Sequence, residues 1–149
     1  MSSYRTLGER GSALRGTETI LLVDDEPIVL KSTSAVLRNF DYTVLEADSG
    51  LQAIKLLREP NSIKLLITDI EMPGMRGPEL ARMAMRNRPG LPVLFISGYY
   101  DQAGFESLMG QEGLDFLPKP VYPRLLASHV RALLDQRRTM SAAGGRFAA

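Results

Sequence analysis

The chain contains no cysteine among its 149 residues. Disulfide bonds, thiolate nucleophiles and cysteine-ligated metals are therefore excluded. The sequence also lacks an apolar run of about 18 residues, the length that a membrane-spanning helix requires. The first 16 residues hold no apolar run at all, so we expect no signal peptide. These absences favour a cytoplasmic domain with no membrane span of its own.

A large excess of positive charge is absent as well. The formal net charge is +1, so we expect no nucleic-acid binding driven by bulk electrostatics. The single histidine, His129, falls in a predicted helix, and we interpret it as a packed or solvated residue. A hydrolase built on Ser97 would lack a histidine base nearby in the sequence.

Five short β-favouring runs alternate with segments that carry helix signals. The predicted strands are residues 19–23, 42–47, 64–68, 92–96 and 114–117. Asp25 is a plausible N-cap for the first helix, and Ser49 for the second. Pro78 and Pro123 open two later helices. The segment 99–112 has only a weak helical pattern, with three glycines in it or at its end, and predicts a short or frayed helix.

This alternation predicts an α/β fold, a single five-stranded parallel sheet doubly wound with five helices. Of the common strand orders, 2-1-3-4-5 suits five strands. It also places the fifth strand at an edge, where Pro118 removes no needed ladder hydrogen bond. We expect a flexible lead over residues 1–17, one domain over 18–137, and a disordered tail over 138–149.

Charged and hydroxyl residues stand where predicted strands end. They are Asp24 and Asp25 after the first strand, Asp69 after the third, Ser97 after the fourth and Lys119 after the fifth. The carboxyl ends of parallel strands share one edge of a sheet, where ligands bind. Three adjacent carboxylates repel one another, and an oxygen-rich cluster suits Mg²⁺ or Mn²⁺. With a lysine and a hydroxyl, such a site can stabilise a phosphoryl group, the aspartate acting as the nucleophile.

The chain resembles the receiver domain of two-component response regulators, over roughly residues 18–136. Four motifs carry the resemblance, in the right order and spacing: LLVDDEP, TDIEMPGMRG, FISG and LPKP. The resemblance implies that Asp69 is the phosphoacceptor. It implies that Asp24 and Asp25 are the acidic pair, with Asp25 a direct metal ligand. The backbone carbonyl of Glu71 would be the third protein ligand.

The same resemblance assigns the remaining site residues. Ser97 matches the switch hydroxyl, Lys119 the phosphate-binding lysine, and Phe116 the aromatic residue whose rotamer reports the state. The Lys119–Pro120 bond is usually cis in this family. The chain departs from the commonest pattern at Gly98, where alanine is usual, and at Phe116, which lacks a phenolic hydroxyl. A third departure is Glu71, which adds a carboxylate beside the site.

The resemblance implies a phosphoacceptor domain of a phosphorelay, not an enzyme in isolation, although it promotes its own phosphorylation and dephosphorylation. A histidine kinase or histidine phosphotransfer protein would supply the phosphoryl group, because this chain holds no suitable histidine of its own. Phosphorylation would shift the face formed by the last helix, the fifth strand and residues 99–112. We expect a monomer or a weak phosphorylation-dependent dimer, without nucleic-acid or direct membrane contact.

Several hypotheses about the kind of protein that contains this domain stay open. The stretches ALRGTETILLVDDEP and FISGYYDQAGFESLMGQEGLDFLPKP are similar to receivers of hybrid histidine kinases, particularly CckA-like kinases. We therefore favour the C-terminal receiver of a hybrid kinase; a stand-alone single-domain regulator is the alternative. From other classes, a non-phosphorylated pseudo-receiver and a haloacid-dehalogenase-like phosphatase remain. For the phosphatase Glu71 has the right spacing, but no insertion the size of a substrate cap is present.

Overall fold

The structure, a computed structural model, describes residues 13–98 and 113–148, with side chains up to residue 136. The helix that we expected within residues 99–112 lies outside the described residues, as do the first twelve residues of the expected lead.

Five parallel strands form one sheet in the order β2-β1-β3-β4-β5, as the sequence predicts. The strands are β1 (Thr19–Val23), β2 (Thr43–Ala47), β3 (Ile63–Asp69), β4 (Val93–Ser97) and β5 (Leu114–Pro118). β5 pairs with β4 alone and places Pro118 in register with Ser97. Pro118 therefore stands in an edge strand, where its missing N–H leaves no gap in the ladder.

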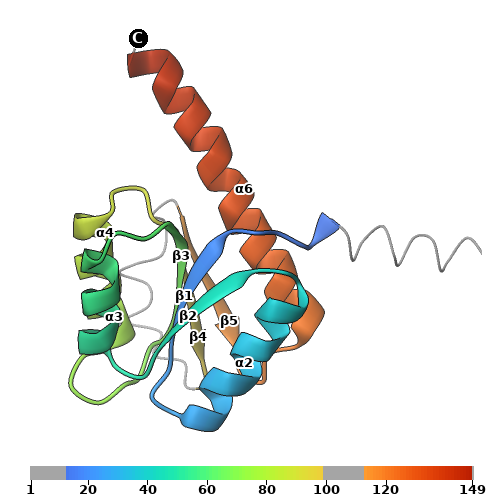
Figure 1. Cartoon of the computed structure of the whole chain (residues 1–149), viewed down its shortest axis with the longest axis vertical. Helices are drawn as coiled ribbons and strands as arrows, with labels where there is room; N and C mark the ends of the chain where they lie inside the picture. Colours follow the sequence, from blue (N-terminus) through green and yellow to red (C-terminus); the bar gives the residue numbers. More distant parts are fainter. Residues whose placement is uncertain (1–12, 99–112, 149) are drawn as a thin grey trace, which may run out of the picture.

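The described residues contain four of the five expected helices. They are α2 (Pro27–Asn39), α3 (Gly50–Arg58), α4 (Gly77–Asn87) and α6 (Pro123–Ala148). Helices α3 and α4 cover one face of the sheet, and α2 and α6 cover the other (Figure 1). Right-handed crossovers between parallel strands place helices on both faces in this way.

Each face of the sheet has its own hydrophobic core. Because side chains alternate along a strand, β1 directs Leu21 and Val23 toward α3 and α4. Its other apolar residues, Ile20 and Leu22, pack toward α2 and α6. All four are at most 2% exposed. Burial on both faces explains why the strands read as continuous apolar runs that stop at polar residues.

The start of α2 corrects one expectation. Its N-cap is Glu26 rather than Asp25, because Pro27 takes the first helical position. The Asp24 carboxylate accepts a hydrogen bond from the Glu26 backbone N–H at 2.9 Å. The prediction for α3 is confirmed, since the Ser49 side chain caps that helix.

The last helix is longer than predicted. We expected a disordered tail over residues 138–149, but the backbone of α6 remains helical to Ala148 and projects beyond the sheet (Figure 1). No proline follows Pro123, and alanine, the best helix former, recurs in this stretch. The pair Gly144–Gly145 costs about 1 kcal/mol per residue relative to alanine, which is not enough to end the helix.

Residues 14–18, which we call the N-terminal strap, correct the expectation of a lead that is flexible up to residue 17. The Tyr42 hydroxyl donates to the carbonyl of Leu14 at 3.1 Å. The guanidinium of Arg15 lies 2.8 Å from the Asp41 carboxylate. The strap is thus fixed against the chain that links α2 to β2.

Helix α6 holds the other side of the strap through Arg131. Its guanidinium nitrogens lie 2.5 and 3.1 Å from the two carboxylate oxygens of Glu18, and one also donates to Tyr42 Oη at 3.1 Å. A Cβ on Gly16 would lie 2.4 Å from atoms of all three side chains, so a larger residue there would displace them. The hydrogen bond from Arg131 lowers the pKa of Glu18 despite its partial burial.

This ion pair predicts an acid-labile part of the stability. Because the folded-state pKa of Glu18 is lowered, its contribution is present above the unfolded-state value, about 4.3, and is lost as the pH falls through the lowered pKa. We expect Glu18→Gln to reduce the free energy of unfolding by about 1–2 kcal/mol at neutral pH. In urea titrations the difference from wild type should shrink below about pH 4.

The matched control for this variant is Glu79→Gln. Glu79 is exposed in the first turn of α4 and has no ion pair among the described residues. Its substitution should change stability by less than about 0.5 kcal/mol. A Glu18→Gln deficit that stayed constant down to about pH 3 would show that the ion pair is not its source.

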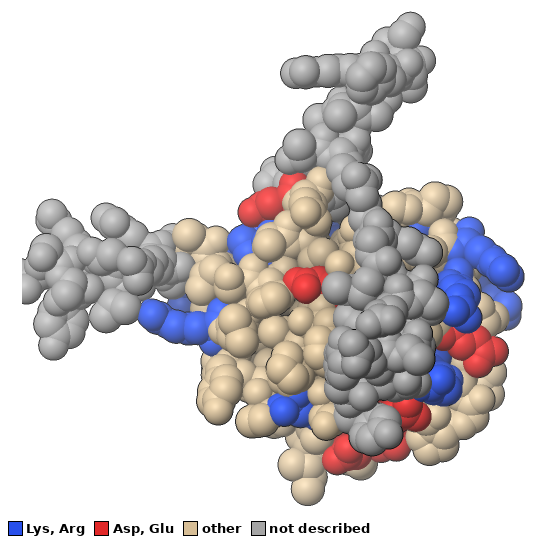
Figure 2. Space-filling model, turned by 180° about the vertical axis from the view of Figure 1, so that it is seen from behind, with Lys and Arg blue, Asp and Glu red and all other residues tan. Residues whose placement is uncertain are grey.

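Charges of both signs lie around the rim of the molecule, with no broad single-sign patch on the uncovered part of the face in Figure 2. This agrees with the formal net charge of +1. Within residues 13–98 and 113–148, no helix combines the length and apolar character needed to cross a membrane.

Candidate functional site

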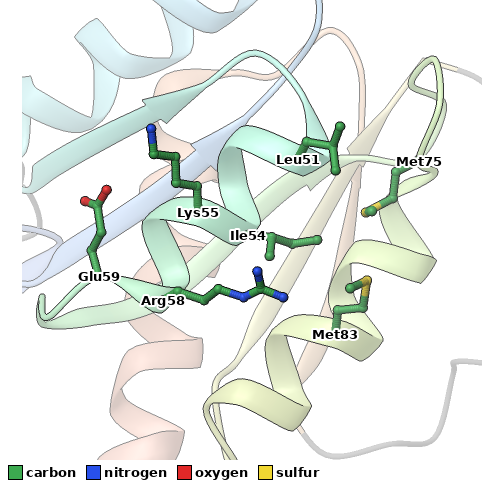
Figure 3. Close-up of a pocket in the computed structure, with 7 residues that line it drawn as sticks. All are labelled: Leu51, Ile54, Lys55, Arg58, Glu59, Met75 and Met83. Carbon is green, nitrogen blue, oxygen red and sulfur yellow. The ribbon is translucent and has the colours of Figure 1, made fainter.

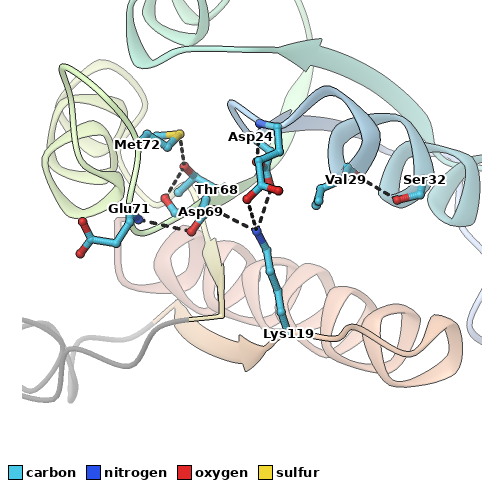
Figure 4. Close-up of polar contacts among 9 residues, drawn as sticks. Asp24, Val29, Ser32, Thr68, Asp69, Glu71, Met72 and Lys119 are labelled. Atoms are coloured by element: carbon cyan, nitrogen blue, oxygen red, sulfur yellow. Dashed lines mark hydrogen bonds and ion pairs between the residues drawn. The ribbon is translucent and has the colours of Figure 1, made fainter.

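The predicted site residues meet at one edge of the sheet. Asp24 follows β1, Asp69 ends β3, Ser97 ends β4 and Lys119 follows β5. Since all strands are parallel, their carboxyl ends bring these side chains to the same edge. Figure 4 shows Asp24, Asp69 and Lys119 pointing toward one another there.

Three carboxylates form the acidic part of the site. Asp24, Asp25 and Asp69 each offer an oxygen, and these oxygens lie within 4.8 Å of one another. Asp24 and Asp69 are only 5% and 6% exposed, whereas Asp25 is half-buried. Burial raises the pKa of Asp24, although the Glu26 N–H and Lys119 act in the opposite direction. Such crowding is unfavourable for carboxylates without a counter-ion.

Lys119 supplies one positive charge to this cluster. Its Nζ lies 2.9 Å from Asp69 Oδ2, 3.3 Å from Asp24 Oδ2 and 3.9 Å from Glu26 Oε1. Burial alone would lower the pKa of Lys119, but the hydrogen bond to Asp69 and the charge of Asp24 outweigh it and raise the pKa. The side chain is therefore an ammonium ion, available to bind an anion at Asp69.

The cluster fits a hard divalent cation. One ammonium ion faces three carboxylates, so the site carries surplus negative charge. All the atoms that could bind the metal are oxygens. Mg²⁺ is commonly bound by a few carboxylates and keeps several waters. Asp24, Asp25 and Asp69 are the residues that could hold it.

Glu71 approaches the site with its backbone rather than its side chain. Its N–H points to Asp69 Oδ1 at 3.3 Å. Its carboxylate instead forms an ion pair with Arg76 at 2.6 Å, and both side chains are 48% exposed. The extra carboxylate expected beside the site is thus directed away from it (Figure 4). This also argues against the phosphatase alternative, in which Glu71 would serve as the general acid.

The two proposed switch residues stand on the strands β4 and β5 that lead to the cluster. Ser97 is 3% exposed, and its backbone carbonyl accepts the N–H of Lys119 at 3.0 Å. Phe116 is half-buried on β5, in register with Phe95 of β4. The Lys119–Pro120 peptide bond is cis, as the resemblance implies.

Sequence reasoning missed two contacts and left His129 without a partner. Arg76 was not connected to Glu71, because five residues along a turn match no helical or strand spacing. Thr68 was also overlooked; its hydroxyl donates to the Asp69 carbonyl at 3.0 Å. His129 lies away from the cluster, where its Nδ1 contacts the Asp115 carboxylate across α6 and β5.

A pocket of about 420 Å³ lies apart from this cluster, between α3 and α4 (Figure 3). Its lining residues are Leu51, Ile54, Lys55, Arg58, Glu59, Met75 and Met83. None of the three clustered aspartates lines it. The pocket is therefore not where a phosphoryl group would meet Asp69.

Comparison with known proteins places the chain in a family. Residues 20–131 match the response regulator receiver domain. The chain belongs to this family, which confirms the resemblance drawn from its four motifs. Receiver domains are phosphoacceptor modules of two-component systems, generally non-enzymatic, that interact with histidine kinases or phosphotransfer proteins and bind Mg²⁺ at an acidic pocket.

Individual relatives differ in how much of their own length this chain covers. Sensor kinase CckA of Brucella abortus (strain 2308) is 34% identical over 130 residues, covering 87% of this chain but 14% of that protein. The response regulator ORR5 of Oryza sativa subsp. japonica is 31% identical over 120 residues, covering 79% of this chain and 90% of that protein. The crystal structure of the receiver domain from hybrid histidine kinase CckA is 38% identical with a TM-score of 0.66. That match covers 78% of this chain and 98% of the receiver.

Proposed function

We propose that this chain is a phosphoacceptor domain in which Asp69 receives a phosphoryl group from a phosphohistidine. The observation that carries the proposal is the position of the Lys119 ammonium, 2.9 Å from Asp69 Oδ2, within a cluster of three carboxylates. This arrangement supplies a nucleophile, a fixed positive charge and oxygen ligands at one point. Phosphoryl transfer requires chiefly positioning and charge neutralisation.

The residues take the following roles in this mechanism. A carboxylate oxygen of Asp69 attacks the phosphorus, the P–N bond to the donor imidazole breaks, and an acyl phosphate forms. Lys119 neutralises negative charge on the phosphoryl oxygens. Asp24, Asp25, Asp69 and the backbone carbonyl of Glu71 would hold Mg²⁺, which neutralises phosphoryl charge when bound.

Phosphorylation adds roughly two negative charges at the carboxyl edge of the sheet. We propose that Ser97 and Lys119 engage these charges in one arrangement of the loops after β4 and β5, with Phe116 following that change. Moving the domain from mostly inactive to mostly active requires several kcal/mol of differential interaction. The outer face of β5 and α6 would present the result to a partner.

We further propose that the chain functions as the receiver of a hybrid histidine kinase. The similarity to CckA supports this setting, whereas the near full-length match to ORR5 supports a stand-alone regulator. The unit that accepts the phosphoryl group would span residues 18–137, and the N-terminal strap would pack against it. We expect it to be a monomer or a weak phosphorylation-dependent dimer.

Intact mass after incubation with acetyl phosphate and Mg²⁺ tests the proposal. We expect a labile adduct of one phosphoryl group in the wild type and none in Asp69→Asn or without metal. If the small donor fails, a phosphorylated histidine phosphotransfer protein is the second donor. Failure with both donors would contradict the proposal and favour the pseudo-receiver, while multiple turnover of a small phosphate ester would favour the phosphatase.

A further inference from the structure

The Glu71 side chain is held on the outside of the site that its own backbone helps to form. Its N–H points to Asp69 Oδ1, so the residue stands directly beside the phosphoacceptor. Its carboxylate is turned outward, where Arg76 Nη2 donates to Oε1 at 2.6 Å. In Figure 4 the carboxylate of Glu71 points away from both Asp69 and Lys119.

Contacts hold the backbone of the loop between β3 and α4, whereas the Glu71 side chain can rotate. The Gly77 N–H donates to the Ile70 carbonyl at 2.9 Å, which closes the loop at its base. Met75 packs so closely on Gly50 that a Cβ there would lie 2.7 Å from the methionine sulfur. With the backbone held at these points, the direction of the Glu71 carboxylate depends on side-chain rotation and on the partner that it finds.

From these contacts we propose that Arg76 is a positioning residue that keeps the Glu71 carboxylate out of the phosphoacceptor site. The inference rests on the proposed function of Asp69 and deepens it. Released from Arg76, the carboxylate becomes a further anionic group beside Asp24, Asp25 and Asp69. It then attracts Mg²⁺ more strongly and repels the negatively charged phosphodonor.

The size of the effect follows from the exposure of the pair. Glu71 and Arg76 are both 48% exposed, so solvent screens their attraction and the bias toward the outward position is modest. We expect Arg76→Gln to lower the dissociation constant for Mg²⁺ by about two- to five-fold. At saturating Mg²⁺, phosphorylation by acetyl phosphate should slow by a similar factor, about two- to five-fold.

Titration calorimetry of the full chain with Mg²⁺ tests whether Arg76 acts by positioning the Glu71 carboxylate or only through its own positive charge. In a Glu71→Gln background, adding Arg76→Gln should leave the dissociation constant unchanged within about two-fold. Arg76→Lys should return it toward the wild-type value. The matched control is Arg82→Gln, which removes the same charge from an exposed α4 residue with no ion pair among the described residues.

Two outcomes overturn the inference while leaving the proposed function intact. In the first, the wild type binds Mg²⁺, but Arg76→Gln changes the dissociation constant no more than Arg82→Gln does. In the second, Arg76→Gln changes the dissociation constant for Mg²⁺ equally in the wild-type and Glu71→Gln backgrounds. A wild-type chain that neither binds Mg²⁺ nor becomes phosphorylated would overturn the proposed function and this inference together.

Discussion

Replacing Gly77 with alanine is expected to lower the free energy of unfolding by about 2–4 kcal/mol. A Cβ at this position would lie 2.1 Å from the carbonyl oxygen of Asp69 and 3.0 Å from Ile70 Cα. Both neighbours are backbone atoms at the end of a buried strand, so neither can move away cheaply. Urea unfolding monitored by circular dichroism measures the loss.

The paired control is Gly98→Ala at the end of β4. A Cβ at this position would lie 3.8 Å from two side-chain carbons of Lys119, an ordinary van der Waals distance. We expect a change within about 0.5 kcal/mol. Equal losses for Gly77→Ala and Gly98→Ala would contradict the packing argument, because the two variants add the same methyl group beside the same site.

Replacing Lys119 with methionine is expected to change two properties in opposite directions. Phosphorylation by acetyl phosphate should fall by about 10²–10³, the usual cost of removing one donor that stabilises transition-state charge. Mg²⁺ should bind more tightly, because the ammonium that competes for Asp69 and Asp24 at 2.9 and 3.3 Å is gone. Phosphorylation rates and Mg²⁺ titrations of the same preparation measure both.

Lys31→Met serves as the control for Lys119→Met. Lys31 is exposed on α2 and has no ion pair among the described residues, so both properties should stay at wild-type values. Weaker Mg²⁺ binding by Lys119→Met would mean that the lysine organises the carboxylates instead of competing with the cation. Phosphorylation at the wild-type rate would remove Lys119 from the mechanism.

The sheet could be predicted from the sequence because its strands are buried on both faces. β1, β3 and β4 read as apolar runs that stop where charged or hydroxyl residues begin, and strand order follows from the alternation with helices. Helix details were less accessible. Asp25 and Glu26 are adjacent acids, and only the position of Pro27 decides which one caps α2. On α2 the small polar residue Ser34 is completely buried.

The residues that form the site could also be predicted from the sequence, because the ends of the strands determine which side chains meet. The direction of each side chain could not be predicted in this way. Arg131 meets Glu18 across 113 residues of sequence, a separation that no periodic pattern reports. The pairing of Glu71 with Arg76 is likewise a choice among possible partners that only the folded loop settles.

The N-terminal strap lies at the amino end of β1, whereas the carboxylate cluster lies at the carboxyl end of the same strand. Five residues of strand separate the two by about 16 Å. Any domain joined ahead of residue 13 would be tethered at the end of the sheet remote from Asp69. Such a tether raises the local concentration of a donor around the receiver. The point of attachment itself lies away from the carboxylate cluster.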